Sequence, residues 1–272
     1  MTGKVRRRRD IRQAPALETD RAVAYLAGPS PITRYRSRMT RQDELKRQAA
    51  AEALTRVRSG MRLGLGTGST MKHFVDLLGE ALSEGHLENI VGVPTSIRTE
   101  TQAREVGVPL APLHELAPLD LAVDGADEVD PRLDLIKGLG GALLREKMIA
   151  QAADSFVVVA DGTKRVERLG TRSPLPVEVV TFAWEAHVPV LRAAGATPEL
   201  RRTSDGSPLV TDNGNFILDC RFADGIEDPV ELERTLALRA GIVDTGLFLD
   251  LADAVIIADE AGLSVHLREE DA

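Results

Sequence analysis

The residues from Met61 to Leu82 constrain the fold more than any other part of the chain. A short apolar run, Met61 to Leu65, leads into the glycine-rich turn Gly64-Leu-Gly-Thr-Gly-Ser-Thr70, and apolar residues then recur at helical spacing as far as Leu82. Strand, glycine turn and helix follow one another without a gap. Because parallel strands need a crossover connection, usually a helix, this order indicates a parallel sheet.

The same alternation extends over much of the chain. Apolar residues at helical spacing begin after Met39 and end before Gly60. Further strands are predicted at 90–93, 119–123 and 156–160, and further helices at about 96–106 and 143–153. These alternating elements predict an α/β fold with an open, mostly parallel, Rossmann-like sheet that has helices on both faces.

The pattern changes after Gly170. The sequence predicts, in order, a strand at 174–180, a helix at 184–194, a hairpin of 209–211 with 215–219, a helix at 229–240 and a strand at 242–245. We interpret these elements as a small α+β, ferredoxin-like second domain at 170–246. A final hairpin of 254–258 with 264–267 is expected to return to the main sheet, so that the larger α/β domain comprises 39–169 and 247–272.

Charge is distributed unevenly along the chain. Residues 1–38 carry ten Lys or Arg against three Asp or Glu, a net charge of +7, whereas the whole chain carries −8 and the remainder therefore −15. This segment contains several prolines and no sustained periodicity, so we expect a flexible basic arm. It is a solvated arm, a tail for an anionic partner, or a stretch that precedes the true start at Met39.

Composition excludes several functional classes. Aromatic residues are only 3% of the chain, too few for base-stacking surfaces, so no specific nucleic-acid partner is expected. The single cysteine, Cys220, excludes an internal disulfide framework, fits a reducing compartment and is interpreted as a half-buried strand thiol. No apolar run approaches the roughly 20 residues of a membrane span, and no signal peptide follows the N-terminal arginines. We therefore expect a cytoplasmic protein without membrane contact.

The glycine turn is the first candidate binding site. Backbone N–H groups at a helix N-terminus attract anions, so Thr67, Gly68, Ser69 and Thr70 are candidates to bind a phosphate group. Ser69 stands where the third glycine of a dinucleotide-binding motif would be, and the lysine of a P-loop is missing, so the turn does not indicate a nucleotide. The alternative is a tight turn with a Ser or Thr cap.

Two carboxylates follow the strand predicted at 119–123. Asp124, Gly125, Ala126 and Asp127 lie where ligands collect in open α/β sheets, at the carboxyl end of a strand, and the carboxylates are suited to bind sugar hydroxyls. An Asp-rich turn that caps the next element is the alternative. No His lies nearby and the spacing is not that of a calcium loop, so no metal site is expected.

A lysine and a glutamate come next. In the segment Lys137-Gly138-Leu139-Gly140, the glycine-rich backbone allows a ligand to approach closely. Lys137 and Glu146 together supply an electrophile and a base, although Glu146 in isolation would more often be a solvated helix residue. Lys164 is either a further phosphate ligand or part of a plain surface turn.

These four stretches, together with Pro174-Leu-Pro-Val-Glu178 and Val210-Thr-Asp-Asn-Gly-Asn215, resemble the A-type ribose-5-phosphate isomerase family in order and spacing. The resemblance extends from about Met39 to the C-terminus and leaves the basic arm without a counterpart. It implies an aldose–ketose isomerase of the non-oxidative pentose phosphate pathway, which interconverts ribose 5-phosphate and ribulose 5-phosphate through an enediolate without a cofactor or a metal. We also expect a homo-oligomer, a dimer or a tetramer, because homo-oligomers are common.

The resemblance also implies roles for residues. Glu146 would be the base that moves a proton between C2 and C1, and Lys137 would stabilise the negative charge that develops on oxygen. Asp124 and Asp127 would bind hydroxyl groups and help to open the furanose ring. The implied substrate-binding residues are Thr67, Gly68, Ser69, Thr70, Asp124, Gly125, Ala126, Asp127, Lys137, Gly138, Leu139, Gly140, Lys164 and Lys46. Leu139 stands where some relatives have glycine.

Two other functions are compatible with parts of this pattern. A sugar-phosphate-sensing module of a transcription regulator shares the sheet and the anion-binding turn but needs no base. Such a protein carries a helix-turn-helix, for which residues 1–38 are too short and too often interrupted by proline. An NAD-dependent dehydrogenase is disfavoured by the missing third glycine.

Overall fold

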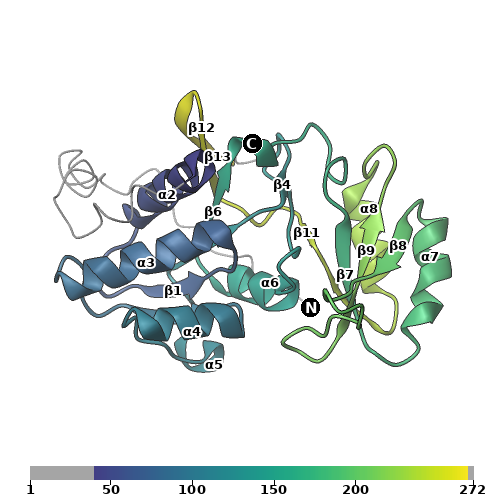
Figure 1. The fold of residues 1–272 in the computed structure, drawn as a ribbon, viewed down its shortest axis with the longest axis horizontal. Coiled ribbons are helices and arrows are strands. Elements are labelled where there is room, and N and C mark those ends of the chain that lie inside the picture. The colour runs from purple at the N-terminus through teal and green to yellow at the C-terminus, as the bar shows by residue number, and fades with distance from the viewer. Residues whose placement is uncertain (1–39, 269–272) are drawn as a thin grey trace, which may run out of the picture. The chain divides into compact units, whose positions relative to one another are not determined.

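The computed structural model describes residues 40–268, which form two compact units (Figure 1). Among the described residues, the first unit contains 40–125, 152–163 and 253–268, and the second contains 126–151 and 164–252. The second unit is larger than the second domain expected from the sequence, whose boundaries stay a prediction. The basic arm expected at 1–38 lies outside the described residues.

A six-stranded sheet forms the centre of the first unit. Its strands lie in the order β13 (Gly262–Leu267), β12 (Ala254–Asp259), β6 (Phe156–Asp161), β3 (Leu121–Gly125), β1 (Arg62–Leu65) and β2 (Val91–Pro94). Every neighbouring pair is parallel except β12 and β13, which form the expected hairpin at one edge. The prediction of an α/β fold with a mostly parallel sheet is therefore confirmed.

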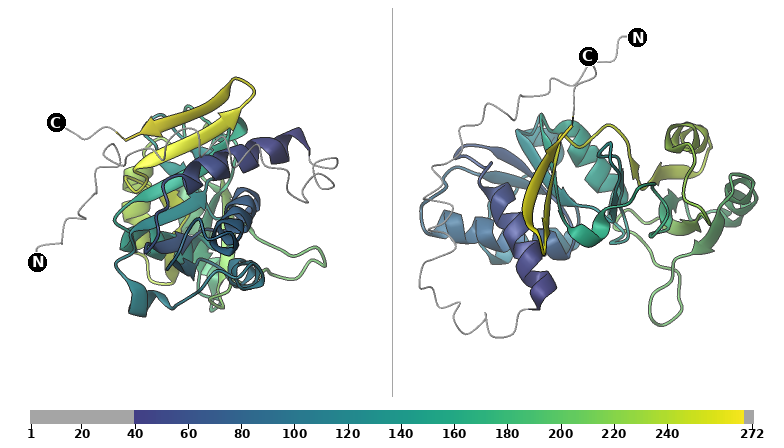
Figure 2. Two further views of the ribbon diagram at one scale, coloured as in Figure 1. Left: turned by 90° about the vertical axis from the view of Figure 1, so that its left-hand side faces the viewer. Right: turned by 90° about the horizontal axis from the view of Figure 1, so that it is seen from above.

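The helices of the first unit are α2 (Arg41–Leu54), α3 (Ser69–Ser83), α4 (Ile97–Glu105) and the single turn α5 (Leu113–Leu116). Side-chain caps define where two of them begin. Thr40 Oγ1 accepts a hydrogen bond from Asp43 N at the start of α2, and Ser96 Oγ accepts one from Thr99 N at the start of α4. Helices α2 and α3 pack together and against the sheet (Figure 2), and their buried side chains share one hydrophobic core with β1 and β6.

The second unit is built on antiparallel sheets. Four strands lie in the order β10 (Ile242–Thr245), β7 (Leu175–Val179), β9 (Phe216–Arg221) and β8 (Thr197–Leu200). Along the chain, helix α7 (Val188–Ala193) separates β7 from β8, and α8 (Pro229–Ala237) separates β9 from β10. This β-α-β-β-α-β order confirms the predicted ferredoxin-like arrangement. The unit also holds a small sheet of β11 (Leu247–Phe248), β5 (Leu135–Ile136) and β4 (Glu128–Val129), and all but the last residue of helix α6 (Leu143–Ala152).

Two local predictions in the second unit are wrong. Residues 209–211 do not form a strand, because β9 already pairs with β7 on one side and β8 on the other; the N–H of Thr211 donates to the carbonyl of Asn215 and closes a turn. The strand that pairs with β9 on this side is β8, whose sequence Thr-Pro-Glu-Leu has no typical strand pattern. The helix predicted at 184–194 is divided into the 3₁₀ turn η5 (Trp184–His187) and α7, with Pro189 in the first turn of α7, where proline is tolerated.

Cys220 lies on β9 and is fully buried, not half-buried as expected. Burial, with a smaller effect of the neighbouring Asp219 charge, raises the pKa of its thiol to about 12. Almost no thiolate, the reactive form, is then present near neutral pH.

We predict that dithiobis(nitrobenzoate) leaves the native protein unmodified and titrates one thiol per chain in concentrated guanidinium chloride. Rapid modification of the native protein would contradict this environment.

Candidate active site

Asp124 and Gly66 bring the end of strand β3 against the glycine turn in the first unit. The buried Asp124 carboxylate accepts hydrogen bonds through Oδ1 from the N–H groups of Thr67 (3.0 Å) and Gly125 (2.7 Å). A Cβ atom on Gly66 would lie 2.2 Å from the same oxygen. Because no real Cβ contact is so short, only glycine permits this approach at position 66.

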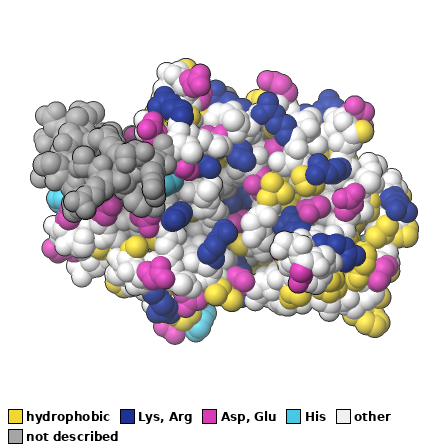
Figure 3. Space-filling model, viewed as in Figure 1, with side chains coloured by type: hydrophobic (Ala, Val, Ile, Leu, Met, Phe, Trp, Pro, Cys, Tyr) yellow, Lys and Arg dark blue, Asp and Glu magenta, His cyan; other side chains and the backbone are white. Residues whose placement is uncertain are grey.

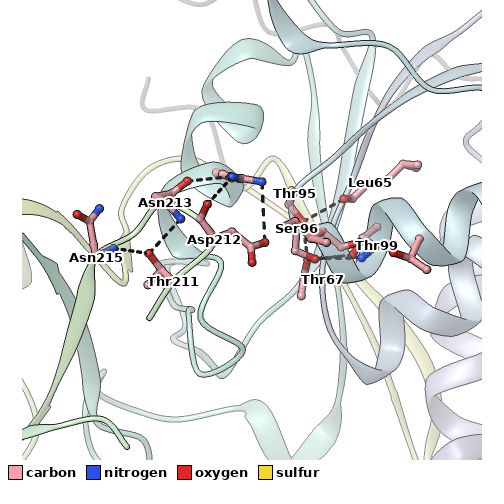
Figure 4. Close-up of polar contacts among 12 residues, drawn as sticks. Leu65, Thr67, Thr95, Ser96, Thr99, Thr211, Asp212, Asn213 and Asn215 are labelled. Atoms are coloured by element: carbon pink, nitrogen blue, oxygen red, sulfur yellow. Dashed lines mark hydrogen bonds and ion pairs between the residues drawn. The ribbon is translucent and has the colours of Figure 1, made fainter. Parts of the chain in front are cut away.

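A cluster of hydroxyl groups supports the same turn (Figure 4). Thr67 Oγ1 lies within 3.0 Å of the hydroxyl oxygens of Thr95, Ser96 and Thr99. The cluster is tied to the backbone, because Thr95 Oγ1 also donates to the carbonyl of Leu65 at the end of β1. Our sequence analysis missed these three supporting residues. The one available signal was the Thr-Ser pair that follows Pro94, after the strand predicted at 90–93.

The first turn of helix α3 has the geometry of an anion site. Gly68 precedes the helix with φ of 136°, a conformation that favours glycine, and the first helical residue, Ser69, is exposed. The N–H of Thr67 already donates to Asp124. The amides that best fit the predicted phosphate site are therefore those of Gly68, Ser69 and Thr70.

Lys137 and Glu146 form a buried ion pair in the second unit. Lys137 Nζ lies 3.2 Å from Glu146 Oε2, and both side chains are only 3% exposed. Lys137 directly follows β5, and Glu146 lies in the first turn of helix α6. The ring of Phe248 lies with its centroid 5.3 Å from the same ammonium group, which is a cation–π distance. The structure thus brings together the two side chains for which the sequence predicted the roles of base and electrophile.

The turn that follows Lys137 is held by two hydrogen-bonding partners. The N–H of Leu139 donates to Oδ2 of the half-buried Asp127 (2.9 Å). Arg201 Nη1 donates to the carbonyls of Gly138 (2.8 Å) and Leu139 (3.1 Å). The side chain of Leu139 is exposed, so the fixed part of this residue is its backbone. Arg201 is a further residue that our sequence analysis missed.

The other predicted site residues lie in both units. Gly125 ends β3 in the first unit, and Ala126 begins the second unit; both are half-buried. Lys164 ends the 3₁₀ turn η4 (Gly162–Lys164) in the second unit, and Lys46 lies on α2 in the first. Both lysines are half-buried, and their contacts with a phosphate group stay predictions.

Charged side chains of both signs are interspersed on the face shown in Figure 3. Within residues 40–268, no group of three or more His, Cys, Asp or Glu side chains is arranged to hold a metal ion.

Taken together, these features define a class of protein. The first unit has a carboxylate and a helix N-terminus at the strand ends of a mostly parallel sheet, and the second has a buried carboxylate–ammonium pair; both features are suited to enzymes that move a proton within a phosphorylated small molecule. The chain matches the family model of ribose 5-phosphate isomerase A (phosphoriboisomerase A) over residues 91–262. It belongs to this family.

Individual relatives match over most of the chain. The ribose-5-phosphate isomerase A of Roseiflexus castenholzii is 52% identical over 227 residues, which cover 84% of this chain and 96% of that protein. The enzyme of Thermococcus kodakarensis is 48% identical over 223 residues, 81% of this chain and 96% of its own. A solved D-ribose-5-phosphate isomerase in complex with phospho-erythronic acid superposes with a TM-score of 0.82 at 43% identity, over 84% of this chain and all of that one. The family inferred from the sequence is confirmed.

We predict that Gly66→Ala lowers kcat/KM at least about 100-fold, because the added methyl group forces Asp124 away from the turn. The clash should also destabilise the fold by about 1–3 kcal/mol. Steady-state kinetics and denaturant unfolding measure the two effects. Gly79→Ala is the matched control, since its Cβ would lie 2.7 Å from Val106 Cβ, and it should lose stability but keep its kcat/KM. Equal kinetic losses in both variants would show that the turn has no special role.

Proposed function

We propose that this chain interconverts D-ribose 5-phosphate and D-ribulose 5-phosphate with Glu146 as the base. Membership of the family supports the reaction. The observation that supports the base is the ion pair, in which Glu146 Oε2 lies 3.2 Å from Lys137 Nζ with both side chains almost completely buried. A carboxylate in this position exchanges a proton beside a fixed positive charge and largely out of water.

The chemistry needs one base and one group that stabilises negative charge. Glu146 takes the proton from C2 of the open-chain aldose, the electrons of that C–H bond form the C1–C2 double bond, and the C1 oxygen becomes negative. Lys137 stabilises this enediolate. Glu146 then returns the proton to C1, while O1 gains the proton that O2 loses and the carbonyl group forms at C2. Atoms and electrons balance, so the net reaction is an isomerisation.

The phosphate group is assigned to helix α3. The amides of Gly68, Ser69 and Thr70 donate to its oxygens at the positive end of the helix dipole, and Lys164 and Lys46 add positive charge. This contact lies far from the reacting carbons of the sugar. Its binding energy therefore serves to orient the reacting carbons for the chemical step.

The sugar hydroxyls are assigned to Asp124 and Asp127, which also assist the opening of the furanose ring. Each carboxylate is fixed by backbone N–H groups: Asp124 by Thr67 and Gly125, and Asp127 by Leu139. Such bonds orient a carboxylate, which favours hydrogen bonds from substrate hydroxyls to its remaining lone pairs.

We predict that Glu146→Gln lowers kcat by about 100-fold or more, because glutamine keeps the shape of glutamate but cannot take a proton. The affinity for inorganic phosphate should stay nearly unchanged, since the phosphate site uses other residues. A coupled optical assay with ribose 5-phosphate and calorimetry with phosphate provide the two measurements. Conversion by the wild-type protein also separates an isomerase from a sugar-phosphate sensor, which needs no base.

The control for this variant is Asp253→Asn. Asp253 is also a buried carboxylate, but it accepts from Phe156 N in the first unit and has no role in the proposed chemistry. Its variant should lose stability and keep a near-normal kcat. Near-normal turnover by Glu146→Gln, or an equal loss in both variants, would remove Glu146 from the role of base.

We further propose a cytoplasmic homo-oligomer, a dimer or a tetramer. Leu263, Val265 and Leu267 alternate along the edge strand β13 and are 42%, 37% and 40% exposed, which supports an association surface at this edge. Within residues 40–268, no helix has both the length and the apolar character needed to cross a membrane. One relative, from Arabidopsis thaliana, is named chloroplastic. Light scattering on the purified protein measures the oligomeric state.

A further inference from the structure

Glu146 stands between two cations that bond to distant parts of the second unit. Arg145 and Lys147 are its neighbours on helix α6. Successive side chains of an α-helix are about 100° apart, so these two project from nearly opposite sides of the helix, about 200° apart, with Glu146 between them. Because both are held by several hydrogen bonds, they fix the rotation of the helix about its axis.

Arg145 is bound by the turn at 211–215, which Figure 4 shows. Its Nε donates to Asn213 Oδ1 and its Nη2 to the carbonyl of Asp212, both at 2.8 Å. The other end of the Asn213 amide, Nδ2, donates to Glu178 Oε1 at 3.2 Å. One end of the amide thus faces a cation and the other a buried anion, so its orientation is determined and it links Glu178 to Arg145.

Glu178 organises the whole of this turn. Its carboxylate is fully buried on β7, and Oε1 also accepts from Thr211 Oγ1 and Asn215 Nδ2, both at 2.9 Å. These bonds connect the Pro-Leu-Pro-Val-Glu and Val-Thr-Asp-Asn-Gly-Asn motifs of the sequence. The proposed chemistry gives neither motif a role. The hydrogen-bond network gives both a structural role, because it holds the turn that bonds Arg145.

Lys147 is held on the other side of the helix. Its ammonium group donates to three acceptors: Asp244 Oδ1 (2.6 Å), Glu233 Oε1 (3.1 Å) and the carbonyl of Thr245 (2.9 Å). All three hydrogens of the ammonium group are therefore used. The centroid of the Phe248 ring lies 5.2 Å from Lys147 Nζ and 5.3 Å from Lys137 Nζ, so one ring contacts both lysines.

We propose that Arg145 and Lys147 are positioning residues that aim Glu146 by fixing the rotation of α6, with Asn213 and Glu178 acting through Arg145. The inference rests on the proposed role of Glu146 as the base. A rotation of about 10° moves a group about 6 Å from the helix axis by about 1 Å. A misplacement of that size costs up to about 100-fold in rate.

The test compares Arg145→Lys with Arg239→Lys. Arg239 has the same bonding pattern, from Nε to His187 Nδ1 and from Nη2 to the carbonyl of Ala186, but with residues outside segment 137–147. Lysine keeps the positive charge but cannot make the two hydrogen bonds that each guanidinium group makes. Arg145→Lys should lower kcat about 10-fold and change KM less than about twofold, whereas Arg239→Lys should leave both unchanged. Inorganic phosphate should bind equally well to the wild type and to both variants.

A double-mutant cycle tests whether Asn213 acts through Arg145. Asn213→Ser should lower kcat to the same extent as Arg145→Lys, and the double variant should be no slower than either single variant. Additive losses, about 100-fold in the double variant, would show that the two residues act independently. Asp244→Asn, which weakens the hold on Lys147, should lower kcat several-fold in the same assay.

Other outcomes would overturn the proposal. A normal kcat in Arg145→Lys would exclude the positioning role, and a weakened phosphate affinity with a normal kcat would make Arg145 a phosphate ligand. Glu146→Gln is measured alongside. If Glu146→Gln keeps its turnover, the proposed base is wrong; if it loses turnover while Arg145→Lys keeps it, only the positioning role is wrong.

Discussion

The ion pair of Lys137 with Glu146 is the interaction on which the proposed chemistry depends, and contacts throughout the second unit support it. Removing two charges from water costs several kcal/mol per ion, and their attraction offsets this only when the geometry is good and the remaining polar groups are satisfied. The structure supports both partners. The ring of Phe248 lies at a cation–π distance from the ammonium group, a hydrogen bond fixes the backbone turn after Lys137, and the two bonded neighbours of Glu146 hold the helix. A buried ion pair is weak evidence for stability. The proposed role in proton transfer therefore explains the presence of this pair better than stability does.

The first unit contributes to the candidate site mainly through backbone groups. Gly66 lets Asp124 approach the turn, the hydroxyl cluster around Thr67 fixes the same turn from another direction, and helix α3 presents its amides. Groups fixed in this way need no reorganisation when an anion binds, which is the advantage of a preorganised site. The parallel sheet makes the arrangement possible, because β1 and β3 are neighbours and end on the same edge.

Much of the fold could be predicted from the sequence, because strands, glycine turns and helices carry strong local patterns, whereas the roles of the candidate site residues came from the resemblance to a family. The ion pair was predictable as two residue types and became a site only when the structure placed them 3.2 Å apart. Other features had no local signal. The two-residue strands β4, β5 and β11 are too short for a pattern, and Pro198 in β8 argues against a strand. The bonds of Glu178 to Thr211 and Asn215 join residues more than 30 positions apart, which no periodicity reveals.

The residues assigned to the chemistry and those that support them come from different parts of the chain. The carboxylates, the lysine and the base lie between Asp124 and Glu146, whereas the groups that bond Arg145 and Lys147 lie in the turn before β9, on α8 and on β10. A helix as short as α6 is only marginally stable alone, so its orientation must come from tertiary contacts. The ferredoxin-like sheet supplies these contacts through buried polar groups, which are directional in a way that apolar packing is not. This accounts for buried carboxylates such as Glu178 in a sheet that contains none of the reacting groups.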